Sequence, residues 1–139
     1  MRLSNLFRSE KSSGNSFAWL HADMHSHLLP GIDDGSPDMA TSLELIKGFQ
    51  ALGYKKIITT PHILWEIYPN TTEIISRKLD EVRKEIAKAK IDIELNAAAE
   101  YFIDDHFAEE VKAKTPLLTI SVNRVLVEFS MFIMPMDLQ

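Results

Sequence analysis

The 139-residue sequence contains no cysteine. Disulfide bonds, zinc sites built on thiolates and cysteine nucleophiles are therefore all excluded. The chain is also shorter than a complete eight-stranded α/β barrel, and its length is that of one domain. Any catalytic reaction of this chain must depend on other side chains or on bound ions.

The sequence also lacks long apolar runs and an excess of positive charge. No stretch approaches the roughly 18 apolar residues that span a bilayer, so no membrane insertion is expected. Residues 9–16 are polar and contain no signal-peptide core, which favours a cytoplasmic location. The formal net charge of -5 argues against nucleic acid or an anionic membrane as the main partner.

What is present is the composition of an ordinary folded domain. Apolar residues make up 45% of the chain and charged residues 25%, as in globular proteins. Residues 1–16 are rich in Ser, Asn and Gly and are expected to form a flexible leader. Residues 17–139 are expected to form a single domain.

Regular elements are predicted from residue 17 onwards. Strands are expected at 17–24, 56–60, 91–98 and 124–129, with a small strand or turn at 117–120. Helices are expected from Ser36 and Pro37 to Gly53, from Thr71 to residue 89, and over 104–114. Strands that are almost continuously apolar and alternate with helices are typical of parallel sheets covered by helices. The predicted fold class is therefore α/β.

Side chains of the kind that bind metals lie at the carboxyl ends of the predicted strands. His25 and His27 close the first strand, and His62 follows the second. Glu100 follows the third strand, and Glu128 lies near the end of the last. In parallel α/β barrels these ends meet at one rim, where the active site forms. We therefore expect these side chains to lie close together.

The first motif, Asp-Met-His-Ser-His at 23–27, predicts a metal site. On an extended chain, the side chains of His25 and His27 point to the same face. Asp23 lies on that face too and is expected to orient a histidine without binding the metal itself. Histidines that only form hydrogen bonds in the core are the alternative, and the spacing favours metal binding.

The remaining acidic residues allow two interpretations each. Asp33 and Asp34 are adjacent in a Gly-flanked loop. The sequence is equally consistent with solvated turn residues and with a metal ligand at this place. For His62, too, a metal ligand and a residue without such a role are both consistent with the sequence. Glu100 follows small residues that leave room around its carboxylate. Glu128 lies among apolar residues, so we expect buried backbone and a charge partner, either a metal ion or an Arg or Lys.

Three imidazoles and at least three carboxylates at one rim indicate more than one divalent ion. Sites with two or three close ions commonly hydrolyse phosphate esters. The ions hold the phosphoryl oxygens, and a bridging water becomes hydroxide near neutral pH. No side-chain nucleophile is then needed, which agrees with the absence of cysteine.

Four ordered motifs carry a family resemblance: DMHSHLLPGIDDG at 23–35, TTPH at 59–62, AEYF at 99–102 and LVEFS at 126–130. Over residues 22–130 the chain resembles the polymerase-and-histidinol-phosphatase (PHP) superfamily. More narrowly, it is similar to the bacterial metal-dependent protein-tyrosine phosphatases of capsule and exopolysaccharide loci. The resemblance implies the N-terminal part of a distorted, TIM-like (β/α)7 barrel with a three-metal site, often holding manganese.

The resemblance also implies a role for each motif residue. His25, His27 and Glu100 would hold the first metal, and Glu100 would bridge to a second metal that Glu128 also binds. Asp34 and His62 would hold the third metal, and Asp33 would be a loop residue only. The implied substrates are phosphotyrosines on bacterial tyrosine kinases that control polysaccharide export; no residue is assigned to substrate binding.

The chain departs from the family pattern at two places. The family's later His, Asp-x-His and arginine motifs have no counterpart after Glu128, so we expect a C-terminally truncated domain. Open barrel edges then predict low stability or self-association, and weak metal binding. The second departure is the apolar Ile-Leu-Trp at 63–65, where relatives often have polar or basic residues. This apolar segment could contact an aromatic phosphoester or pack against the helix that begins near Thr71. The sequence favours neither role over the other.

Two alternatives to a tyrosine phosphatase remain open at the level of sequence. One is a small-molecule phosphatase of the same superfamily, similar to histidinol phosphatase. The loop PGIDDG at 30–35 favours the tyrosine-phosphatase branch over it. The other is an inactive remnant whose motif residues no longer have a function.

Overall fold

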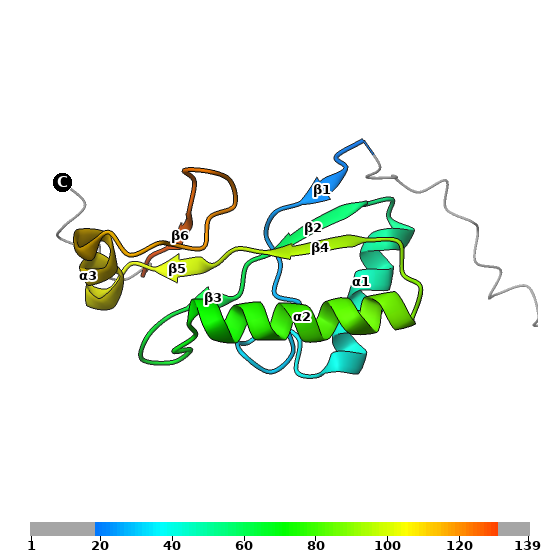
Figure 1. Ribbon diagram of the computed structural model, residues 1–139, viewed down its shortest axis with the longest axis horizontal. Helices are drawn as coiled ribbons and strands as arrows, with labels where there is room; N and C mark the ends of the chain where they lie inside the picture. The colour runs from blue at the N-terminus through cyan, green and yellow to red at the C-terminus, as the bar shows by residue number, and fades with distance from the viewer. Residues whose placement is uncertain (1–18, 131–139) are drawn as a thin grey trace, which may run out of the picture.

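The computed structural model describes residues 19–130 (Figure 1). The leader predicted at 1–16, and the start of the strand predicted at 17–24, lie outside the described residues. Within the described part, no helix has the length and apolar character needed to cross a membrane.

The described part contains six strands and three helices. The strands are β1 (Ala22–Asp23), β2 (Lys56–Thr59), β3 (His62–Ile63), β4 (Glu94–Ala97), β5 (Glu100–Phe102) and β6 (Leu126–Glu128). The helices are α1 (Met39–Ala51), α2 (Thr72–Lys88) and α3 (Asp105–Ala113). Each helix and four of the strands fall inside predicted ranges, whereas β3 and β5 were not predicted. Residues 117–120 form no strand.

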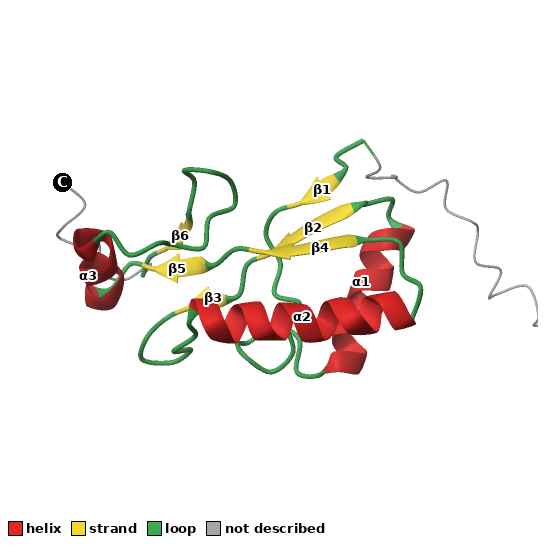
Figure 2. Cartoon of the chain, in the orientation of Figure 1, coloured by secondary structure: helices red, strands yellow, loops and turns green. Residues whose placement is uncertain are grey.

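All pairs of these strands are parallel, as predicted. One sheet has the order β1-β2-β4 and the other the order β3-β5-β6. The chain runs directly from β2 into β3 and from β4 into β5, so the second sheet continues the first (Figure 2). The predicted α/β class is therefore confirmed.

The two stretches of chain that run from the first sheet into the second, β2 to β3 and β4 to β5, are interrupted at the same level. Pro61 has no N–H to donate to a strand ladder, and β2 ends just before it, at Thr59. Across the interruption, Ala98 N donates to Thr59 O at 2.9 Å and Glu100 N donates to Pro61 O at 3.0 Å. His62 and Glu100 consequently begin a second pair of strands, whereas the sequence pattern placed them directly after the ends of predicted strands.

Helix α1 begins two residues later than predicted. Asp38 is its N-cap, and the Asp38 side chain accepts a hydrogen bond from Thr41 N at 2.8 Å. The predicted cap, Ser36, is buried, and its hydroxyl bonds to Asp38 O and to the Ser42 hydroxyl instead. The predicted end is confirmed, because Gly53 directly follows the C-cap and has a φ of 98°.

Helix α2 supplies much of the core. Its buried residues are Ile75, Leu79, Val82 and Ile86, at the spacing of one helix face. They pack in one cluster with the sheet residue Ile57 and with residues of α1 and of the loop after β1. Each such side chain stabilises the fold by about 1.5–3 kcal/mol. Helix α3 has no buried residue and lies beside the second sheet (Figure 1).

Candidate metal centre

Glu100 lies at the centre of the predicted site. Its Oε2 atom is 3.1 Å from His25 Nε2, 3.1 Å from His27 Nε2 and 3.6 Å from His62 Nδ1. Glu100 is the first residue of β5 and pairs directly with His62, the first residue of β3. The interrupted strands therefore place one buried carboxylate among three imidazoles that come from two parts of the chain.

His62 connects Glu100 to the other two predicted carboxylates. His62 Nε2 is 3.5 Å from Asp34 Oδ1, and His62 Nδ1 is 3.6 Å from Glu128 Oε2. The Nδ1 atom is buried and has no hydrogen-bond partner in the described part of the chain. A buried ring nitrogen at this distance from two carboxylates is suited to binding an ion between them.

The six residues predicted as metal ligands form three overlapping groups. These are His25, His27 and Glu100; His27, Asp34 and His62; and His62, Glu100 and Glu128. In each group the ligand atoms lie within 4.8 Å of one another. The structure therefore brings together every residue that the sequence predicted for metal binding.

Glu128 is more exposed than the sequence predicted. Its side chain is 47% exposed, and Val127 and Phe129 on either side are exposed as well. The apolar neighbours that suggested a buried setting are themselves exposed because, in the described part, β6 pairs only with β5. The backbone carbonyl still accepts a hydrogen bond from Ile103 N at 2.8 Å, which fixes Glu128 beside Phe102 in the register.

Asp33 is a loop residue, as predicted, but it also holds the cluster in place. Its side chain is fully buried and accepts three hydrogen bonds. The donors are His27 Nδ1 at 2.8 Å, Gly35 N at 3.0 Å and His62 N at 3.1 Å. The Asp-x-Gly spacing is a signal for such a turn, but nothing in the sequence indicates which of the two aspartates points inward.

Hydrogen bonding shifts the pKa values of Asp33 and His27 in opposite directions. Burial raises the pKa of the Asp33 carboxyl, but the hydrogen bonds from His27, Gly35 and His62 outweigh it and hold the pKa below its usual value. The same hydrogen bond, from His27 Nδ1 to the Asp33 carboxylate, raises the pKa of His27 against the effect of burial. A proton on His27 Nδ1 leaves the Nε2 lone pair directed at Glu100.

Gly35 is required for a close approach to His27. A Cβ atom at Gly35 would lie 2.3 Å from His27 Cβ and 2.4 Å from His27 O. The same backbone oxygen accepts a hydrogen bond from Ser36 N at 3.1 Å. The loop that contains both aspartates is therefore packed tightly under the second histidine.

The role predicted for Asp23 stays a prediction. Its Oδ2 atom is buried and has no hydrogen-bond partner in the part of the chain that the structure describes. The carboxylate that orients a histidine here is Asp33, which contacts His27.

The donor set fits divalent ions. His27 has a carboxylate oxygen at each ring nitrogen, Asp33 Oδ2 at 2.8 Å and Glu100 Oε2 at 3.1 Å. A neutral imidazole has only one N–H, so this arrangement needs a positive charge, either a second proton or an ion at Nε2. Imidazole nitrogens and carboxylate oxygens without thiolates suit first-row divalent metals such as manganese, iron and zinc.

The fold and the site define a mixed α/β protein with a histidine–carboxylate cluster where its parallel strands meet. The sequence model of the family described as "Capsular polysaccharide synthesis, CpsB/CapC" matches residues 21–137. The chain therefore belongs to the CpsB/CapC family.

Individual relatives agree with this assignment. CapC of Staphylococcus aureus is 33% identical over 92 residues, covering 66% of this chain and 36% of the relative. Tyrosine-protein phosphatase YwqE of Bacillus subtilis is 31% identical over 108 residues, covering 77% and 42%. A chain from the crystal structures of YwqE and of Streptococcus pneumoniae CpsB, described as "unique metal-dependent tyrosine phosphatases", is 30% identical. It superposes with a TM-score of 0.70 over 78% of this chain and 44% of that chain.

The chain spans less than half the length of each of these relatives. The matching part contains all six residues of the cluster.

Proposed function

We propose that this chain is the metal-binding part of a phosphatase that hydrolyses phosphotyrosine on proteins. The observation that carries the proposal is the placement of Glu100 Oε2 within 3.6 Å of three histidine ring nitrogens. Relatives named tyrosine-protein phosphatase support the choice of reaction over a small-molecule phosphatase similar to histidinol phosphatase. The absence of cysteine excludes the thiolate route to the same products.

The proposed site holds up to three divalent ions, with manganese as the first candidate. His25, His27 and Glu100 would bind one ion, Glu100 and Glu128 a second, and Asp34 and His62 a third. When bound, such ions neutralise phosphoryl oxygens and lower the pKa of water enough to supply hydroxide near neutral pH.

The chain's own residues prepare this chemistry. Asp33 fixes the His27 ring through Nδ1, so that Nε2 remains directed at the cluster. Glu100 faces several histidines at once, which suits a bridging ligand. His25 is 55% exposed, so the cluster is open to solvent and to substrate on that side.

Two further parts of the proposal follow from the family. The described residues form the N-terminal part of a distorted PHP (β/α)7 barrel. The substrate is a bacterial tyrosine kinase that takes part in capsule or exopolysaccharide synthesis, as the family description suggests. The cytoplasmic location expected from the sequence stays a prediction.

The test compares metal content and activity of the purified chain. Manganese binding is measured by calorimetry, and phosphate release is followed from a phosphotyrosine peptide and from histidinol phosphate. We expect manganese-dependent release from the peptide only. His25→Ala should lose the ion held by His25, His27 and Glu100, and phosphate release with it. The matched control is His21→Asn, because His21 lies outside the cluster and its φ of 60° is tolerated by Asn. Metal binding without phosphate release, in a folded chain, would instead support the inactive remnant.

A further inference from the structure

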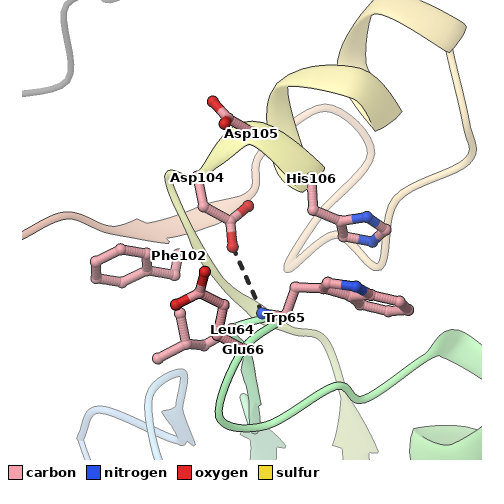
Figure 3. Close-up of a pocket in the computed structure, with 7 residues that line it drawn as sticks. All are labelled: Leu64, Trp65, Glu66, Phe102, Asp104, Asp105 and His106. Atoms are coloured by element: carbon pink, nitrogen blue, oxygen red, sulfur yellow. Dashed lines mark hydrogen bonds between the residues drawn. The ribbon is translucent and has the colours of Figure 1, made fainter.

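A cavity of about 270 Å³ lies beyond the metal cluster, between the loop after β3 and the start of α3 (Figure 3). Its lining residues are Leu64, Trp65, Glu66, Phe102, Asp104, Asp105 and His106. Leu64 and Phe102 lie two residues past His62 and Glu100 along the chain. Side chains two apart on extended backbone share a face, about 7 Å along the strand. The cavity therefore adjoins the metal cluster on the same face of the second sheet.

Aromatic rings form two sides of this cavity. The Trp65 and His106 rings stack with centroids 4.0 Å apart and an interplanar angle of 19°. In Figure 3 the carboxylates of Glu66 and Asp104 lie between this stacked pair and the Phe102 ring. Of the residues that line the cavity within 19–130, none is Lys or Arg. Carboxylates beside aromatic rings attract a cation by charge, and a cation over an open ring face gains a cation–π contact as well.

Backbone hydrogen bonds hold the wall of the cavity in place. Asp104 caps α3, and its Oδ1 accepts from Phe107 N at 2.8 Å. Its Oδ2 lies 3.4 Å from Trp65 N, which ties the loop after β3 to the start of α3. Trp65 remains 46% exposed, although it is a large apolar side chain. The cavity is thus ordered and accessible.

We propose that this cavity binds the ammonium or guanidinium group of a Lys or Arg that neighbours the phosphotyrosine in a peptide substrate. The inference rests on the proposed function, because the phosphate would occupy the adjoining metal cluster. An extended peptide spans about 3.3–3.6 Å per residue. A side chain one to three residues from the phosphotyrosine therefore reaches the cavity. Recognition of a basic neighbour makes the cavity a determinant of substrate specificity.

The test uses Trp65 as a fluorescent reporter. Trp19→Phe leaves Trp65 as the one tryptophan, since the sequence contains two. Trp65 emission is titrated, with manganese present, by a peptide that carries Lys two residues from a non-hydrolysable phosphonate analogue of phosphotyrosine. The same peptide with Gln in place of Lys is titrated in parallel. Both peptides are also tested without the phosphate. We expect the Lys peptide to bind roughly two- to fivefold more tightly, the effect of about one exposed charge pair.

Substitutions in the cavity test the assignment. Glu66→Gln and Asp104→Asn together are expected to abolish the preference for Lys; Asn caps helices as well as Asp does, so α3 is retained. Glu66→Gln alone keeps the hydrogen bond from Trp65 N to Asp104 Oδ2 and should weaken the preference without disturbing the loop. The control is Glu109→Gln, which changes the net charge on α3 but does not line the cavity. It should leave the preference unchanged, and circular dichroism checks that each variant is folded.

The outcomes separate the two proposals. Equal affinity for the Lys and Gln peptides, or a preference that survives in the Glu66→Gln/Asp104→Asn variant, overturns the cavity assignment. Emission that changes with protein concentration and not with peptide identifies a second copy as the occupant and also overturns it. A preference for Lys that is independent of phosphate supports the cavity and contradicts the proposed function. Hydrolysis of both phosphotyrosine peptides with no preference for Lys supports the proposed function and contradicts the cavity assignment.

Discussion

Asn in place of Asp33 should weaken both folding and metal binding, although it changes only one atom of the side chain. Asp33 Oδ2 accepts from His27 Nδ1 and His62 N, and Asp33 Oδ1 accepts from Gly35 N. An amide has one acceptor oxygen and one donor nitrogen. In either orientation of the amide, its NH₂ group must therefore face an N–H group.

The expected loss follows from this mismatch. An unpaired buried donor costs about 1–3 kcal/mol, so urea unfolding should report a free energy of unfolding lower by about that amount. A histidine that loses its orienting carboxylate typically loses roughly 10–100-fold in metal affinity. Calorimetric titration with manganese should therefore show weaker binding at the site that includes His27.

Asp38→Asn is the matched control. Asp38 is an exposed helix cap that accepts from Thr41 N, and Asn replaces Asp at such caps at little cost. It changes the net charge by the same amount and should leave unfolding and metal binding unchanged. If Asp33→Asn unfolds at the same urea concentration and binds manganese as tightly as the control, the positioning role assigned to Asp33 is refuted.

Other substitutions test other parts of the fold. Gly35→Ala should destabilise the fold by about 1–3 kcal/mol through overpacking against His27; an unchanged urea midpoint would contradict that contact. Tyr101→Phe removes the acceptor for Leu118 N, a 2.8 Å hydrogen bond, and should cost about 1 kcal/mol by the same assay; no loss would mean that this bond is not formed in solution. Ile57→Ala should cost about 2–5 kcal/mol, because Ile57 is fully buried, and a cost below 1 kcal/mol would argue against a packed core.

The arrangement of the site was predictable from the sequence because it depends on a simple rule. Parallel strands bring their carboxyl ends together, and ligand-type residues recur at the ends of predicted strands. That rule alone predicts that His25, His27, His62 and Glu100 lie together. The apolar face of α2 was predictable for a similar reason, since its buried residues recur with helical spacing.

The rest depends on contacts between distant segments. Asp33 and Asp34 are adjacent and chemically identical, and only the approach of His27 and His62 makes one of them buried. The exposure of Glu128 follows from how many strands flank β6, which local composition does not reveal. The short strands β3 and β5 are hard to predict because each contains two or three residues, too few for a periodic pattern.

The aligned interruptions at Pro61 and at Ala98 have a consequence for how this sequence can evolve. His62 faces Glu100 because both strands resume with the same register after the same number of steps. A single-residue insertion or deletion between Thr59 and His62 would turn every following side chain of β3 to the opposite face. The two junctions should therefore tolerate substitutions far better than changes in length, unless both change length together.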